Sequence, residues 1–188
     1  MNDCSETPMV LVAMPRLRDP NFQKTVVLVM EHNADGAMGF ILNRPAETDV
    51  RDLVVSSDLE IPPNIQAWFG GPVGDDNGLI LYKPDEENTW GDIIEISSSE
   101  ETLLKLIGHH KSPKDYNKYM YPYRFVIGHS AWEGGQLDDE IRSGIWLPGQ
   151  MNKNLLLDCP WQEMWPRCLD QIGVNSANLV TYEQTYMN

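Results

Sequence analysis

A tight-turn signal between two apolar segments limits the folds open to this chain more than any other part of its sequence. Thr25–Met30 is rich in β-branched residues, the polar stretch 31–36 ends in Asp35-Gly36, and Ala37–Leu42 is apolar again. Asp-Gly between two such segments favours a β-hairpin, because its tight turn needs positive φ angles that these residues tolerate. The sequence therefore predicts an antiparallel hairpin here.

Further strands are predicted where short apolar runs stand between glycine, proline and acidic loops. These runs are Met9–Met14, Gln66–Phe69, Gly78–Tyr82, Asp92–Ile96, Tyr123–Ile127, Ile145–Leu147 and Leu155–Leu157. Strands and helical segments alternate without a regular strand–helix–strand rhythm, and no internal repeat is present. We therefore expect an α+β fold in a single domain over residues 1–188, a length suited to one well-packed core.

Helices are predicted at three places. Ser98 and Glu101 form a capping box, and Gly108 can close the helix that follows it. That helix would turn one apolar face inward, formed by Leu103, Leu104 and Ile107. Gly134–Arg142 is a second helix, and Pro160 can begin a third, in which Pro166 predicts a kink or a new start near Trp165.

The overall charge bears on the class of partner. The formal net charge is -14 with a pI near 4.5, so the chain repels nucleic acid and direct DNA binding is not expected. The segment Lys105 to Arg124 runs against this average, since it is rich in lysine, histidine and tyrosine. It is either a solvated loop, which we favour, or a surface for an acidic partner or an RNA strand.

The hydrophobic runs, the cysteines and the histidine spacing of the sequence bear on cellular location and on metal or cofactor binding. Met9–Met14 lies behind an acidic leader and is too short to span a membrane. Three scattered cysteines, Cys4, Cys159 and Cys168, suit reduced thiols in the cytoplasm. The pairs Glu31-His32 and His109-His110 lack the spacing that brings two ligands to one metal. We expect a cytoplasmic protein without metal or cofactor.

The segment Gly128–Leu137 is similar at first sight to a serine nucleophile turn. That turn needs glycine two places before and two places after the serine, and Trp132 occupies the second position after Ser130. His129 cannot act as the base, because neighbours along a strand point to opposite faces. We therefore expect Gly128 and Ser130 to be small because Trp132 packs over the backbone.

Three motif blocks together carry a family resemblance. The first runs from Asp19-Pro20-Asn21-Phe22 through Thr25-Val26-Val27 and Glu31-His32-Asn33 to Gly39-Phe40-Ile41-Leu42-Asn43-Arg44-Pro45. The second is Phe69-Gly70-Gly71-Pro72-Val73, and the third is Gly128 with Trp132, Gly135, Gln136 and Leu137. In this order and spacing, over roughly residues 9–173, the chain resembles the AlgH/YqgE family of bacterial proteins.

The resemblance implies a cytoplasmic bacterial protein whose mixed β-sheet curls into a small barrel surrounded by helices. The family label implies a role in regulating transcription, and no catalytic residue or cofactor comes with it. Cys159 departs from the threonine that usually caps the last helix, and Pro166 interrupts a helix that usually lacks it.

The leading hypothesis is a non-enzymatic binding or regulatory protein that holds a small ligand or a protein partner. Its candidate ligand-binding residues have the most unusual local chemistry of the three blocks: Asn43, Arg44, Gly70, Gly71, Trp132 and Gln136. Gly70 and Gly71 can either expose amides to an anion or form a sharp turn, which we favour. Arg44 can clamp a phosphate or carboxylate, although an internal ion pair is the favoured interpretation. The alternative function is a hydrolase that uses Ser130, or a carboxylate with His32.

Overall fold

The computed structural model describes residues 7–53, 61, 65–82, 94–109, 123–149, 157 and 159–174. Its strands are β1 (Met9–Ala13), β2 (Val26–Asn33), β3 (Gly36–Ile41), β4 (Pro45–Asp49), β5 (Gln66–Phe69), β6 (Val73–Tyr82), β7 (Glu95–Ser97), β8 (Tyr123–Glu133) and β9 (Trp146–Gly149). Its helices with defined bounds are α1 (Val50–Leu53), α2 (Glu100–His109), α3 (Gln136–Arg142) and α5 (Trp161–Gln171). The α+β class is confirmed.

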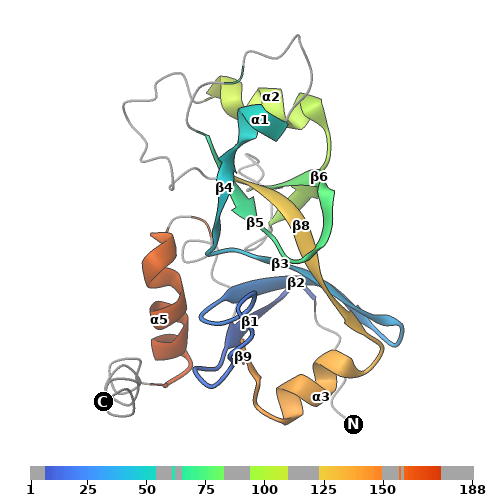
Figure 1. The fold of residues 1–188 in the computed structure, drawn as a ribbon, viewed down its shortest axis with the longest axis vertical. Coiled ribbons are helices and arrows are strands. Elements are labelled where there is room, and N and C mark those ends of the chain that lie inside the picture. Colours follow the sequence, from blue (N-terminus) through green and yellow to red (C-terminus); the bar gives the residue numbers. More distant parts are fainter. Residues whose placement is uncertain are drawn as a thin grey trace, which may run out of the picture.

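Strand β8 spans the molecule. It begins near helices α1 and α2 and ends near α3 at the opposite end (Figure 1). The strand order is β4-β5-β8-β3-β2-β1-β9, and β6 pairs with both β8 and β7. The first half of β8 pairs in parallel with β5 at Phe125–Ile127, whereas its second half pairs with β3 at Ser130–Glu133. The sheet is therefore mixed.

The expected small barrel is wrong. Within the described residues the pairing path ends at β4 on one side and at β9 on the other, and these two strands do not pair. The physical reason lies in β8, which exchanges β5 for β3 as its neighbour along its length. The strands on that side of β8 therefore diverge into two parts instead of curling round to meet.

The predicted hairpin is confirmed as β2 and β3, and it contains a bulge. Val29 pairs with Gly39, but the next partner, Met38, pairs with Glu31, so Met30 is the extra residue. An extra residue reverses the side to which the following side chains point. As a result His32, opposite Ala37, lies on the same face as Val29.

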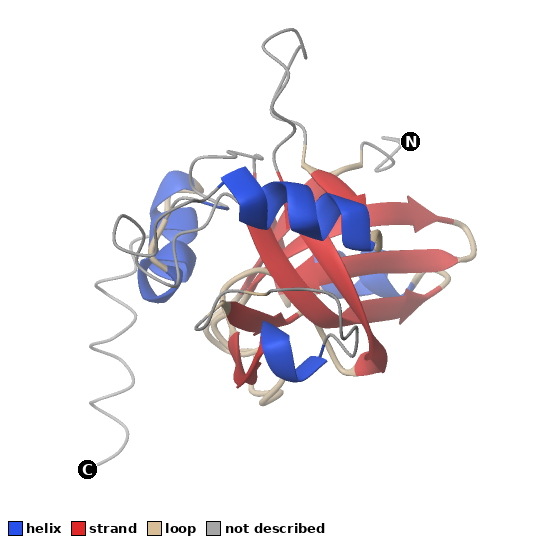
Figure 2. Cartoon of the chain, turned by 90° about the horizontal axis from the view of Figure 1, so that it is seen from above, coloured by secondary structure: helices blue, strands red, loops and turns tan. Residues whose placement is uncertain are grey.

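Three hydrophobic clusters form the core. Helix α5 covers one face of the β1–β3 region through Met164, Trp165, Cys168 and Leu169. The opposite face packs against α3 through Leu137 and Ile141. The third cluster lies around α2, which crosses over the sheet in Figure 2. Both faces of the sheet are therefore covered by helices.

Helix α2 differs in detail from its prediction. It begins at Glu100, where the Oγ of Ser99 accepts a bond from the Thr102 amide at 3.4 Å. Gly108 lies inside the helix instead of closing it. Leu103 and Ile107 are buried, but Leu104 is 44% exposed because it lies off their face. The predicted strand Leu155–Leu157 falls mostly outside the described residues.

Helix α5 passes through Pro166 without the new start near Trp165, and the alternative, a kink, stays a prediction. Proline removes one backbone bond and crowds the preceding turn. Here buried side chains lie on both sides of Pro166, from Met164 to Leu169. Their packing on the sheet offsets the lost bond, since tertiary burial contributes more to most helices than propensity does.

Candidate functional site

Asn43 joins the end of β3 to the start of β2. Its Oδ1 accepts a bond from the Val26 amide at 2.8 Å, and its Nδ2 donates to the Lys24 carbonyl at 2.9 Å. The side chain is 8% exposed. Its amide group is therefore already bonded within the chain.

Arg44 holds the segment Asp19–Lys24, which we call the strap. Its guanidinium donates to the carbonyl oxygens of Pro20 at 2.7 Å, Asn21 at 2.7 Å and Gln23 at 3.2 Å. Burial lowers the pKa of Arg44, and the nearby charge of Asp19 acts in the opposite direction. The expected internal ion pair is wrong, because among the described residues the guanidinium contacts neutral carbonyls and no carboxylate.

Gly70 and Gly71 lie where the chain passes over β8. Strands β5 and β6 occupy opposite edges of β8, so the residues between them must cross that strand. A Cβ at Gly70 would lie 2.3 Å from the Gly128 oxygen, and one at Gly71 would lie 2.3 Å from the His129 carbonyl carbon. A Cβ at Gly128 would in turn lie 2.4 Å from the Gly71 oxygen. We call Gly70, Gly71 and Gly128 the glycine crossing.

This contact corrects the interpretation of Gly128 and Ser130. Gly128 has φ +67 and is small because the backbone of Gly71 crosses it, not because Trp132 packs there. The Gly70 amide donates to the Ile127 carbonyl at 2.8 Å, so it is not free to bind an anion. The second and third motif blocks are thus the two sides of one backbone contact.

Ser130 is fully buried beside this crossing. Its hydroxyl donates to the Gly70 carbonyl at 3.1 Å, and that carbonyl also accepts the Ile41 amide at 2.8 Å. A nucleophilic serine must meet its substrate and a base. The burial and the bond of this hydroxyl give the serine version of the hydrolase alternative no support.

Trp132 belongs to a group that we call the aromatic–glutamate cluster, formed by Phe22, Trp132, Glu140 and Trp146. The indole N–H groups of Trp132 and Trp146 donate to Oε2 of Glu140 at 2.9 and 2.8 Å. The two indoles meet edge to face at 6.1 Å, and Phe22 lies 5.8 Å from the Trp146 ring. One carboxylate therefore satisfies two buried donors.

Gln136 extends this cluster at the start of α3. Its Nε2 donates to Oε1 of Glu140 at 2.9 Å, and its Oε1 accepts the Glu133 amide at 2.9 Å. Gly135 at the helix N-cap has φ 77 and offers no side-chain cap. Gln136 thus closes the turn between β8 and α3 while it also fixes the glutamate.

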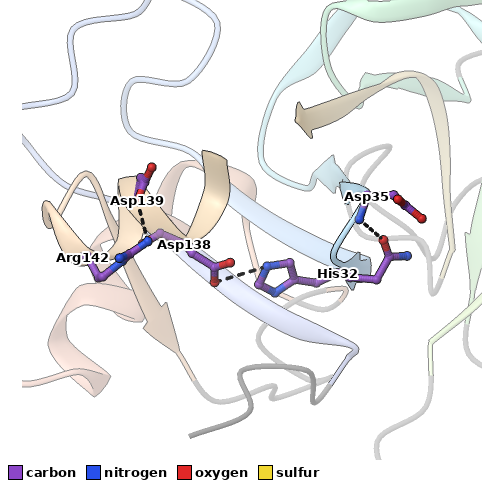
Figure 3. Close-up of polar contacts among 6 residues, drawn as sticks. His32, Asp35, Asp138, Asp139 and Arg142 are labelled. Carbon is purple, nitrogen blue, oxygen red and sulfur yellow. Dashed lines mark hydrogen bonds and ion pairs between the residues drawn. The ribbon is translucent and has the colours of Figure 1, made fainter. Parts of the chain in front are cut away.

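Among the described residues, His32 is the histidine that forms an ion-pair contact with a carboxylate. Figure 3 shows its ring directed from β2 toward Asp138 of α3, and Nε2 lies 3.4 Å from Oδ1. The His32 side chain is only 7% exposed, whereas that of Asp138 is 40% exposed. His32 Nδ1 is buried without a hydrogen-bond partner. A buried ring behind an exposed carboxylate joins α3 to β2, and it does not present a base to solvent.

Other titratable groups in the described residues form isolated pairs, such as Arg51 with Asp49 and Arg167 with Glu163. Asp139 forms an ion pair with Arg142 on the outer side of α3 (Figure 3). Within the described ranges there is no group of three or more His, Cys, Asp or Glu residues that can hold a metal ion. Cys159 and Cys168 are free and buried, and burial raises the pKa of Cys168 to about 12. Such a thiol is a poor nucleophile.

The strap links the candidate residues to one another. The Phe69 amide donates to the Arg44 carbonyl at 2.9 Å, which places Arg44 next to Gly70. Arg44 holds the strap, and the strap carries Phe22 to Trp132. The use of these residues as one ligand site stays a prediction.

Sequence reasoning missed the parts played by Phe22 and Glu140. Phe22 belongs to the motif Asp19-Pro20-Asn21-Phe22, but no local pattern pairs it with Trp132. Glu140 stands in an acidic run with Asp138 and Asp139, and nothing in that run singles it out. The available signal was its place between Trp132 and Trp146, because buried indole N–H groups need an acceptor.

The comparisons with known proteins agree with one another. The AlgH-like family model matches residues 10–177. A UPF0301 protein of Aliivibrio fischeri is 31% identical over 182 residues, with 90% of this chain and 92% of the relative covered. One from Pectobacterium atrosepticum is 33% identical over 184 residues, with 91% and 94% covered.

Solved structures give the same result. The solution structure of the AlgH protein from Pseudomonas aeruginosa matches with a TM-score of 0.69 and 29% identity, covering 96% of this chain and 97% of that one. A Corynebacterium diphtheriae protein at 18% identity, covering 88% of each chain, shares the fold with a TM-score of 0.61. Among the described helices none is long and apolar enough to cross a membrane. This chain is a member of the AlgH-like family of bacterial UPF0301 proteins.

Proposed function

We propose that this protein acts by binding a partner, as a non-enzymatic binding or regulatory protein. The support comes from the polar side chains of the motif blocks, which bond within the chain. Asn43, Ser130 and Gln136 have intramolecular partners for the groups that a substrate would need. Such an arrangement stabilises a surface and leaves little for acid–base chemistry, which needs a reachable proton donor or acceptor.

The surface that we propose lies directly beside the glycine crossing. Pro72, Val73 and Gly74 are exposed, and Val73 is 43% exposed although it begins β6. The observation that carries the proposal is this apolar residue, held in solvent by a rigid backbone contact. Contiguous exposed apolar surface marks protein contact sites, and we propose that Pro72 and Val73 form the centre of one.

A regulatory role through another protein fits the charge better than direct DNA contact does. The net charge of -14 opposes binding to phosphates. We place the protein in the cytoplasm, where buried free thiols such as Cys159 and Cys168 stay reduced. On this proposal, any effect on transcription passes through the partner.

Two exposed residues provide a matched test. Val73 and Leu104 are similarly exposed, at 43% and 44%, but Leu104 lies on α2 away from the crossing. A photoreactive amino acid is placed at either position in the full chain within bacterial cells, and cross-linked species are separated by mass. We expect a discrete cross-linked protein from position 73 and none from position 104. Equal cross-linking at both positions, or none at position 73, contradicts the proposed surface.

A further inference from the structure

Among the described residues, the guanidinium of Arg44 donates its hydrogen bonds to neutral carbonyls, while the charge of Asp19 lies nearby. An arginine side chain has five N–H donors, and Arg44 uses three hydrogen bonds, all to strap carbonyls. No described carboxylate forms an ion pair with it, although the protein as a whole is strongly acidic. The side chain is only partly buried. Within the described part of the chain, two of its five N–H donors are therefore available to a charged acceptor.

The stretch 16–24, which includes the strap, is basic in sequence. Arg16 and Arg18 precede the strap and are exposed, while Asp19 is the one acidic residue between positions 16 and 24. Lys24 ends the strap with φ 56.

We infer that Arg44 is a binding site for a small oxyanion, a phosphate or a carboxylate, which takes the guanidinium from the strap carbonyls. This inference rests on the proposed function, for which it supplies the ligand class. The planar fork of arginine matches two oxygens of such an anion, and charge-assisted bonds are stronger than bonds to neutral carbonyls. Pro20 and Gln23 are exposed, so their carbonyls turn to water when the guanidinium leaves.

Release of the strap changes the aromatic–glutamate cluster. Phe22 lies between the carbonyls that Arg44 holds, and its ring packs 6.3 Å from Trp132 and 5.8 Å from Trp146. An anion at Arg44 therefore frees Phe22 and exposes the rim of both indoles. Anion binding at Arg44 should therefore change the surroundings of Trp132 and Trp146, although the anion contacts neither residue.

The test follows the indole N–H signals of Trp132 and Trp146 by NMR in the full chain. Inorganic phosphate and malonate are titrated separately at constant ionic strength, with chloride as the control. We expect both signals to move saturably with one or both oxyanions and not with chloride. A response to phosphate alone assigns a phosphate ligand, and a response to malonate alone assigns a carboxylate. No saturable response to either anion overturns the inference.

Two variants make the test specific. Arg44→Lys keeps the charge but loses the fork, so the response is expected to vanish, whereas Arg142→Lys on α3 is expected to respond as the natural protein does. Phe22→Ala keeps Arg44 and weakens the competing strap, so phosphate binding by calorimetry is expected to tighten severalfold. A response that persists in Arg44→Lys, or unchanged affinity in Phe22→Ala, overturns the inference. If the anion experiments contradict the inference but position 73 still gives a discrete cross-linked protein, the proposed function holds without an anion site at Arg44.

Discussion

The glycine crossing and the aromatic–glutamate cluster lie a few residues apart on β8, yet they are held by opposite means. At the crossing, backbones approach so closely that a Cβ at Gly128 would lie 2.4 Å from the Gly71 oxygen. In the cluster, large side chains meet around the carboxylate of Glu140. The glycine crossing requires residues without a side chain, whereas the aromatic–glutamate cluster requires the side chain of Glu140.

This difference says which substitutions each region tolerates. Extra atoms at the crossing meet backbone, which cannot turn away as a flexible side chain can. A missing carboxylate in the cluster leaves buried indole donors without an acceptor, which costs more than the net value of the bonds. Substitutions that add atoms should therefore destabilise the glycine crossing most. Substitutions that remove a side chain should destabilise the aromatic–glutamate cluster most.

The largest expected effect is that of Gly128→Ala. The left-handed backbone costs an alanine about 1 to 2 kcal/mol, and the clash with Gly71 adds up to about 3 kcal/mol. Gly135→Ala is the matched control, because Gly135 has φ +77 but no atom within 4 Å of its Cβ position. We expect free energies of unfolding in urea to fall by about 4 kcal/mol for Gly128→Ala and about 1 kcal/mol for Gly135→Ala. Equal losses would show that only φ matters at the crossing.

Glu140→Ala should have the next largest effect. It leaves the indole N–H groups of Trp132 and Trp146 without their acceptor, and these residues are 7% and 1% exposed. Unsatisfied buried donors cost about 1 to 3 kcal/mol each, so we expect a loss of about 3 kcal/mol in the free energy of unfolding.

The neighbour Asp139 is the control for that variant. Asp139→Ala removes a carboxylate from an exposed ion pair with Arg142, which contributes at most about 1 kcal/mol. If both variants lose similar amounts in urea unfolding, the glutamate is not the centre of its cluster. Glu140→Gln keeps one acceptor oxygen and should fall between the two.

The comparison also explains how far the sequence was informative. Strands such as β1 and β5 were predicted because their apolar pattern is local, and so was the hairpin that Asp35-Gly36 marks. Strand β4, Pro45–Asp49, was missed because its residues are polar and its pairing depends on β5. The open sheet was missed as well, since the exchange of neighbours along β8 leaves no local mark.

The candidate site shows the same limit. The sequence singled out the motif residues, yet it did not reveal that Gly71 and Gly128 touch each other. Contacts between distant backbones depend on topology, and glycine reports only that something comes close. The acceptors of Arg44 were missed for a similar reason, because carbonyl groups occur at every residue and carry no sequence signal.

A smaller effect is expected for Arg44→Lys, which connects the two regions through the strap. Lysine cannot reach the carbonyls of Pro20, Asn21 and Gln23 together, because its single ammonium lacks the arginine fork. Part of the side chain is solvated, so we expect a loss of about 1 to 2 kcal/mol in urea unfolding. Arg142→Lys, in an exposed ion pair, should be nearly neutral. An equally small change at Arg44 would mean that Phe22 and the bond from Asn43 to Lys24 hold the strap without it.

Ser130→Ala should have the smallest effect, although Ser130 is fully buried in the motif that most resembles a nucleophile turn. The lost hydroxyl leaves no orphan acceptor, because the Gly70 carbonyl still accepts the Ile41 amide at 2.8 Å. We expect a loss of about 1 kcal/mol in urea unfolding, the net value of one hydrogen bond. Ser130→Val, which adds atoms at the same place, should cost about 1 to 3 kcal/mol through overpacking. A larger loss for Ser130→Ala than for Ser130→Val would mean that the hydroxyl contributes more to stability than the tight packing around it. Position 130, next to the glycine crossing, would then be more sensitive to removed atoms than to added ones.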